Sequence, residues 1–120
     1  MIEAFIGLMS GTSLDGISAA VVEFEDDGDA AAGGEPGTEA HATRAPRAER
    51  FTVRSFVQLP YAPAQRDRIA AALERGTPAE YCRLNFDLGA WLADAALTVI
   101  EASGIPRERV RAIASHGQTV

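Results

Sequence analysis

The sequence contains no lysine and only one cysteine, Cys82, and these two shortages exclude several kinds of protein. A P-loop needs a lysine that reaches the nucleotide phosphates, so that motif is absent. One cysteine cannot form a disulfide within the chain or a zinc site built from several thiolates, and scarce cysteine is typical of a reducing cytoplasm. The 11 arginines face 17 acidic residues, and this net charge of −6 without a basic cluster argues against a nucleic-acid partner.

Long apolar runs are missing as well. No stretch approaches the roughly 18 apolar residues of a membrane-spanning helix. The first residues, Met1-Ile2-Glu3, carry an acid where a signal peptide has positive charge. We therefore expect a cytoplasmic protein with no membrane partner. The 120 residues suffice for one modest domain, since domains usually have about 100 to 200 residues.

The most informative pattern that is present is a cluster of glycine and hydroxyl residues at positions 7–17. Apolar runs at residues 4–9 and 17–24 flank it, so the cluster is predicted to connect two antiparallel strands as a hairpin tip. Glycine, serine, threonine and aspartate are ordinary turn residues, and composition alone favours a plain structural hairpin. A nucleophile elbow is excluded because Asp15 stands where that motif requires glycine.

The same hairpin also suits a phosphate group. Gly11 and Gly16 permit positive φ or a close approach of the backbone to a ligand. Thr12 and Ser13 add hydroxyls that can donate to phosphate oxygens. Successive amides around such a turn can form a concave anion site. The residues by themselves leave the structural and the phosphate-binding interpretations both open.

The rest of the chain alternates between strand and helix signals. The first strand is continuously apolar, which predicts cover on both of its faces. A third strand is predicted at residues 51–59, with Phe51, Val53, Val57 and Leu59 on one face. A short helix is expected at residues 64–75, and Thr77-Pro78-Ala79-Glu80 is a capping box that begins a second helix reaching about Ser103. Residues 25–50 are poor in large apolar side chains and predict a disordered insertion loop.

A last strand at residues 110–114 follows the second helix, so we expect it to lie parallel to an earlier strand. The segment Ser115-His116-Gly117-Gln118 then sits at the carboxyl end of this strand, where α/β sheets place their sites. Gly117 permits a close backbone approach, while Gln118 and Thr119 offer donors and acceptors for sugar hydroxyls. A lone histidine such as His116 is more often structural or solvated than catalytic.

Three motifs together resemble one known family. Met9-Ser10-Gly11-Thr12-Ser13-Leu14-Asp15-Gly16 is similar to the N-terminal signature of the anhydro-N-acetylmuramic acid kinases, bacterial members of the sugar kinase, heat-shock chaperone and actin superfamily. The segment at residues 115–120 resembles the second signature of that family, and Arg83-Leu84-Asn85 with Leu88-Gly89 matches between them. The chain departs from the pattern at Ser18, where the family usually has an aspartate.

The resemblance implies a fold of the α/β class, a ribonuclease H-like or actin-like ATPase lobe. In it, an antiparallel three-strand meander is extended by a parallel strand, with helices packed on the sheet. Residues 1–120 would be part of the N-terminal lobe of a two-lobed kinase. The resemblance also implies ATP and Mg²⁺ as cofactors, a small-molecule sugar substrate and a possible homodimer.

The implied activity is hydrolysis of the 1,6-anhydro ring of anhydro-N-acetylmuramic acid and phosphorylation of the sugar at O6, for peptidoglycan recycling. The catalytic aspartate is expected beyond Val120, no metal ligand is assigned, and the 120 residues alone are expected to be inactive. The sugar is expected to face four residues: His116, Gly117, Gln118 and Thr119. The residues expected to bind ATP are Gly11, Thr12, Ser13, Leu14, Asp15, Gly16, Ile17 and Ser18.

Two alternatives remain at this point. One is a non-enzymatic nucleotide-binding or regulatory member of the same superfamily, which would use ATP to shift conformation. The other is a truncated gene product without activity. The sequence that follows Val120 separates them from a kinase, because a kinase needs a second phosphate loop and a catalytic aspartate there.

Overall fold

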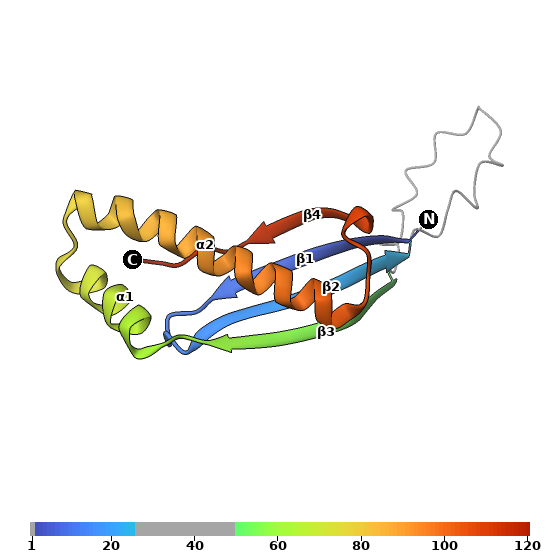
Figure 1. Ribbon diagram of the computed structural model, residues 1–120, viewed down its shortest axis with the longest axis horizontal. Coiled ribbons are helices and arrows are strands. Elements are labelled where there is room, and N and C mark those ends of the chain that lie inside the picture. Colours follow the sequence, from blue (N-terminus) through green and yellow to red (C-terminus); the bar gives the residue numbers. More distant parts are fainter. Residues whose placement is uncertain (1, 26–49) are drawn as a thin grey trace, which may run out of the picture.

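The computed structural model describes residues 2–25 and 50–120 and shows a four-stranded sheet with two helices (Figure 1). The elements confirm the predicted order of strands and helices, with ends that differ by one or two residues. They are β1 (Glu3–Ser10), β2 (Gly16–Glu25), β3 (Arg50–Pro60), α1 (Pro63–Arg75), α2 (Pro78–Ser103), a short 3₁₀ turn (Arg107–Arg109) and β4 (Val110–Ser115).

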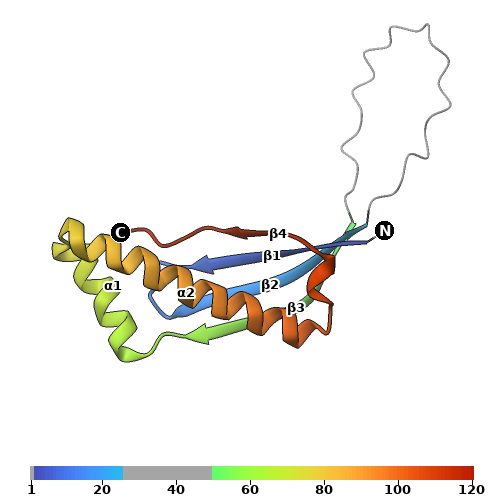
Figure 2. The same ribbon diagram turned by 45° about the horizontal axis from the view of Figure 1, so that its top comes forward.

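The sheet has the strand order β3-β2-β1-β4. Strand β2 pairs antiparallel with both β1 and β3, and β4 pairs parallel with β1, as predicted. Because β1 and β4 are parallel neighbours, their carboxyl ends lie at the same end of the sheet. Helix α2 runs along the sheet, and the chain end beyond β4 returns beside its first turns (Figure 2).

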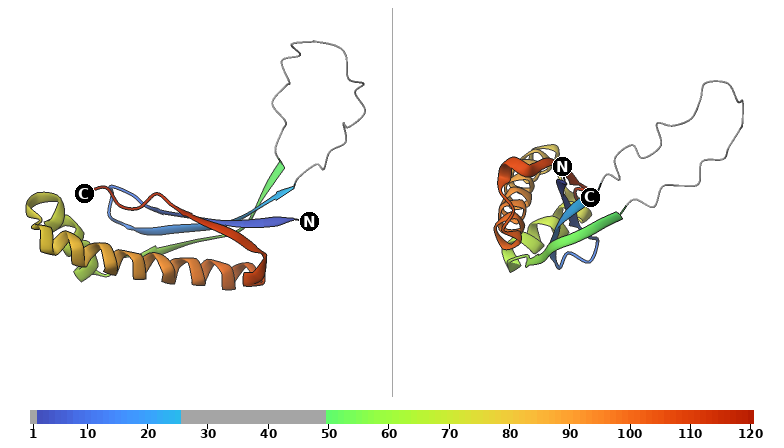
Figure 3. Two further views of the ribbon diagram at one scale, coloured as in Figure 1. Left: turned by 90° about the horizontal axis from the view of Figure 1, so that it is seen from above. Right: turned by 90° about the vertical axis from the view of Figure 1, so that its right-hand side faces the viewer.

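The hydrophobic core lies between α2 and one face of the sheet. Alternate residues of β1 and β2 point into it, and each fully buried side chain, such as Ile6 or Val99, contributes about 1.5 to 3 kcal/mol. Both helices lie on this one face (Figure 3). The prediction that β1 is covered on both faces is therefore wrong for the described residues: Met9, which points to the opposite face, is 52% exposed.

A β-bulge changes which side chains of β3 share a face. Val21 pairs with Ser55, but Val22 pairs with Val53, so Arg54 is the extra residue. Beyond the bulge every side chain changes face, and the predicted grouping of Phe51, Val53, Val57 and Leu59 is wrong. Val57 and Leu59 pack on the core, whereas Phe51, Val53 and Phe56 are exposed on the opposite face.

The second helix begins as its sequence predicted. Thr77 Oγ1 accepts a hydrogen bond from the Glu80 amide at 3.3 Å, and the Glu80 carboxylate accepts one from the Thr77 amide at 3.1 Å. Pro78 occupies the first turn, and Gly104 at φ 70° ends the helix in the left-handed conformation. Among the helices of the described ranges, none combines the length and apolarity needed to cross a membrane.

The predicted insertion at residues 25–50 falls almost entirely outside the described residues. Its two end residues belong to the sheet, since Glu25 closes β2, Arg50 opens β3, and the two pair with each other. The expectation for residues 26–49 stays a prediction.

Candidate functional site

The hairpin between β1 and β2 ends in a tight turn. The Leu14 amide donates to the Gly11 carbonyl at 3.2 Å, which closes the turn around Thr12 and Ser13. Leu14 has a positive φ of 56°, unusual for a residue with a branched side chain and costing about 1 to 3 kcal/mol. Its side chain is buried in a cluster with Ile69, Ala72, Leu84 and Leu88 of the two helices. The helices therefore hold the turn in place through Leu14.

The exposed part of the turn offers hydrogen-bond donors. Within the described residues, the amides of Thr12 and Ser13 donate to no acceptor, and both side chains are exposed. A Cβ added at Gly11 would meet only Ser13 Oγ, at 3.7 Å, so the space beside this glycine is open. These donors fit an anion such as a phosphate group. In the parts of the chain that the structure covers, no group of three or more His, Cys, Asp or Glu side chains could hold a metal ion, and Asp15 stands alone at the tip.

The last three predicted ATP-binding residues occupy a different environment. Gly16, Ile17 and Ser18 are the first residues of β2, paired with β3 and, for the latter two, also with β1. The Ile17 side chain lies in the core with 2% exposure. The eight predicted residues thus divide into an exposed turn, Leu14 as its buried anchor, and a strand start. Their binding of ATP stays a prediction.

The second signature continues from β4 along the end of β1. The His116 amide donates to the Leu8 carbonyl at 3.0 Å, which extends the parallel pairing by one residue. Gly117 then turns the chain with a φ of 72°, and its amide donates to Ser115 Oγ at 3.0 Å. The side chains of His116 and Thr119 are exposed. This turn directs Gln118 back toward the base of the hairpin.

A buried polar contact joins the two signatures. Ser10, 2% exposed at the end of β1, has its hydroxyl 2.6 Å from the Tyr61 hydroxyl and also donates to Gln118 Oε1. The Tyr61 amide donates to the Asp15 carbonyl at 3.0 Å, and its ring packs edge-on against Trp91 of α2 at 5.9 Å between ring centroids. Sequence reasoning missed Tyr61, which has no motif around it and only the preceding Pro60 to mark the strand end.

Burial raises the pKa of the Tyr61 hydroxyl above its ordinary value, while the hydrogen bond with Ser10 lowers it by less. The fold therefore favours the protonated phenol. A raised folded-state pKa contributes stability that is present below about pH 10, the pKa of unfolded tyrosine, and is lost as the pH rises through the folded pKa.

We expect the unfolding free energy of this chain to fall as the pH rises above about 10, and to fall less in Tyr61→Phe. Denaturant titrations at several pH values measure this. The sequence has no lysine to titrate in the same range, which keeps the comparison simple. Parallel pH profiles for the two proteins would contradict the assignment to Tyr61.

A hollow of about 560 Å³ lies between the first half of α2 and the chain end. Gly117 and Gln118 line it from one side, and Asn85 and Gly89 of α2 from the other. Among the residues that the structure covers, none comes within 4 Å of a Cβ added at Gly89, so the hollow is wider with glycine there than with a residue that has a side chain. Its remaining lining residues are Tyr81, Cys82, Leu84, Leu88, Leu92 and Val120. The structure thus brings two of the four predicted sugar-facing residues together with the motif on α2, while His116 and Thr119 are not among the lining residues.

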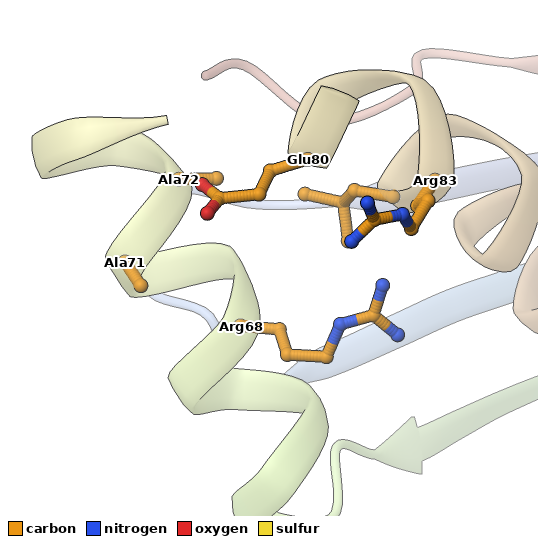
Figure 4. Close-up of a pocket in the computed structure, with 6 residues that line it drawn as sticks. Arg68, Ala71, Ala72, Glu80 and Arg83 are labelled. Carbon is orange, nitrogen blue, oxygen red and sulfur yellow. The ribbon is translucent and has the colours of Figure 1, made fainter. Parts of the chain in front are cut away.

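A smaller hollow of about 270 Å³ separates α1 from α2, and Arg68 and Arg83 extend into it from the two helices (Figure 4). Arg68 forms an ion pair of 2.7 Å with Asp87 and lies 5.7 Å from the centroid of the Trp91 ring. Glu80, on the same rim, caps the start of α2. Of these charged groups, Arg68 joins the two helices through Asp87 and Trp91. The hairpin residues 11–18 line neither hollow.

Comparison with known proteins adds independent information. A family model described as anhydro-N-acetylmuramic acid kinase matches residues 3–120. A protein of that name from Xanthomonas campestris pv. campestris is 34% identical over 119 residues, which cover 97% of this chain and 26% of the relative. Proteins of the same name from Caldanaerobacter subterraneus and Gloeobacter violaceus are 31% and 36% identical, each over 96% of this chain and over 25% and 26% of their own lengths. The chain therefore spans about a quarter of the curated relatives it matches.

Proposed function

The chain belongs to the anhydro-N-acetylmuramic acid kinase family, and on that premise we propose that the complete protein phosphorylates anhydro-N-acetylmuramic acid with ATP. Water opens the 1,6-anhydro bridge and becomes the hydroxyl at C1, and the O6 released from the bridge receives the γ-phosphoryl group. The observation that carries the proposal is the direct contact between the two signature motifs: Ser10, which precedes the candidate phosphate turn, donates to Gln118, which lines the candidate sugar hollow.

In this proposal the turn binds the ATP phosphates and the larger hollow binds the sugar. Phosphoryl transfer depends mainly on positioning and on stabilising charge. The amides and hydroxyls of Thr12 and Ser13 would hold the phosphates, and the hollow lined by Asn85, Gly117 and Gln118 would hold the sugar. Mg²⁺ bound to ATP would neutralise phosphate charge, and Asp15 is the one carboxylate that residues 11–18 contain. The aspartate that activates water is proposed to lie in the remaining three-quarters of the protein.

We also propose that residues 1–120 form part of the N-terminal lobe of a two-lobed, actin-like kinase. The strand order β3-β2-β1-β4, with an antiparallel meander followed by a parallel strand, supports this proposal. The greater length of the relatives supports it as well.

The test uses the complete protein, ATP, the anhydro sugar and water enriched in heavy oxygen. We expect a product with phosphate at O6 and solvent oxygen at C1, identified by mass spectrometry and phosphorus NMR. The 120-residue chain alone should give no product, because it lacks the rest of the site. Turnover by this chain would contradict the proposal that the catalytic aspartate lies outside residues 1–120. Nucleotide binding by the complete protein without any product would favour a regulatory member of the superfamily.

A further inference from the structure

The contacts of Gln118 determine which way its side-chain amide points. Gln118 Nε2 donates to the Thr119 carbonyl at 3.0 Å, and a carbonyl oxygen can only accept. Turning the amide over would bring two oxygens together at that position. Gln118 Oε1 therefore faces the Ser10 hydroxyl.

The direction of the neighbouring hydrogen bonds follows from that orientation. Because Gln118 Oε1 only accepts, Ser10 must give it the single hydroxyl proton that serine has. Ser10 Oγ can then only accept from Tyr61, whose hydroxyl lies 2.6 Å away. The three side chains form a chain of donors that runs from Tyr61 through Ser10 to Gln118. Its central member, Ser10, is shielded from water with 2% exposure, and Tyr61 and Gln118 are half-buried.

The orientation of the Gln118 amide determines which hydrogen-bonding groups it offers to the hollow that it lines. Gln118 Oε1 is directed at Ser10, which is not among the residues that line the hollow, and one N–H is directed at the Thr119 carbonyl. Within the described residues, the second N–H has no acceptor. We propose that Gln118 acts in this hollow solely as a hydrogen-bond donor, and that Tyr61 and Ser10 are positioning residues that keep it in this role.

The ligand atom that fits such a group is an oxygen that accepts without donating. For the sugar, whose identity rests on the proposed function, the ether oxygens and the acetamido carbonyl are atoms of this kind. If the amide could rotate freely, Gln118 could also present its carbonyl oxygen, and the hollow would then bind ligand donors as well as ligand acceptors. Fixing the amide therefore makes the hollow select for an acceptor. Loss of one such hydrogen bond weakens binding by about 2- to 12-fold.

The first arm of the test needs no ligand. In the complete protein with nitrogen-labelled glutamine, the Gln118 side-chain signal is identified by its loss in Gln118→Ala. We expect the nuclear Overhauser effects of the side-chain amide protons to be stronger to Thr119 than to Ser10, because Nε2 donates to the Thr119 carbonyl and Oε1 faces Ser10. We expect this preference to weaken in Ser10→Ala. Stronger effects to Ser10 in the unmodified protein, or an unchanged preference for Thr119 in Ser10→Ala, would overturn the donor orientation.

The second arm measures binding of the anhydro sugar and of ATP by calorimetry, with KM and kcat alongside. Tyr61→Phe should weaken sugar binding and raise its KM by about 2- to 12-fold, and Ser10→Ala by at least as much, with kcat and ATP affinity nearly unchanged. Ser55→Ala is the matched control: it removes a strand serine hydroxyl that donates to the Val99 carbonyl at 2.9 Å, away from Gln118. It should leave sugar binding unchanged.

The outcomes separate the two proposals. Equal weakening by Ser55→Ala, or no weakening by Tyr61→Phe and Ser10→Ala, would overturn the positioning role. Weakened ATP binding with unchanged sugar binding would show that the donor serves a phosphate oxygen and would overturn its assignment to the sugar. If the unmodified protein binds no anhydro sugar, the proposed function fails, while the ligand-free NMR measurement still decides the orientation of Gln118. Should Ser10→Ala not fold, Tyr61→Phe, which keeps the ring, carries the binding test.

Discussion

A Gly16→Ala variant is expected to lose about 3 kcal/mol or more of its unfolding free energy. The added Cβ would lie 2.1 Å from the Leu59 carbonyl oxygen and 2.9 Å from the Pro60 Cα. These atoms belong to the backbone of β3, which cannot rotate aside as a side chain can. Gly16 pairs with Pro60 at the end of the β2–β3 ladder, so relief of the clash requires the two strands to separate there. Chemical denaturation, followed by circular dichroism, measures the loss.

The matched control for this prediction is Gly7→Ala. Gly7 lies in the neighbouring strand β1, and a Cβ there would meet no atom of residues 2–25 and 50–120 within 4 Å. Its unfolding free energy should stay within about 1 kcal/mol of the unmodified chain. If the two alanine variants unfold at the same denaturant concentration, the close approach of β3 to Gly16 is not what requires glycine at this position.

A Gly11→Val variant of the complete protein should bind ATP at least about tenfold more weakly, with little change in unfolding free energy. The described part of the fold tolerates a side chain at Gly11, because its only atom within 4 Å of an added Cβ is Ser13 Oγ, at 3.7 Å. A valine would occupy the open space beside the Thr12 and Ser13 amides, through which a phosphate group would approach. Losing two such hydrogen bonds to a charged group corresponds to more than a tenfold change.

Calorimetric titration with ATP and thermal unfolding of the same samples check this prediction. Gly11→Ala provides a graded comparison, since its smaller side chain should weaken binding less than valine does. Unchanged nucleotide affinity in Gly11→Val would remove the turn from the ATP site. Weaker binding accompanied by an equal loss of stability would mean that Gly11 serves the fold, as Gly16 does.

Gly11 and Gly16 belong to one eight-residue motif, but their surroundings in the structure differ. At Gly16, β3 passes too close for any side chain, whereas at Gly11 the described residues leave open space, and a requirement for glycine there stays a prediction. Neither has a positive φ, while Leu14 between them does. Conformational freedom of glycine, the first explanation that the sequence suggests, is therefore not what either position uses.

Local signals in the sequence determined the order and type of the elements. The capping box at Thr77, the proline after it and the three-and-four spacing of apolar residues defined α2, because helix hydrogen bonds and caps join residues at most four apart. The hairpin was equally readable, since both of its strands are adjacent in the chain. The family signatures could be recognised in the same way, as uninterrupted strings of residues.

The tertiary structure alone decided how these pieces meet. The bulge at Arg54 moved Phe51 and Val53 to the face opposite the core, and an alternating pattern cannot reveal an extra residue in a strand. The contacts of Ser10 with Tyr61 and Gln118 span 51 and 108 residues of chain, so no local spacing encodes them. They arise because the parallel pairing of β4 with β1 brings the carboxyl ends of both strands to one place. Tyr61, directly after β3, reaches the same place, where its amide donates to the Asp15 carbonyl and its hydroxyl contacts Ser10.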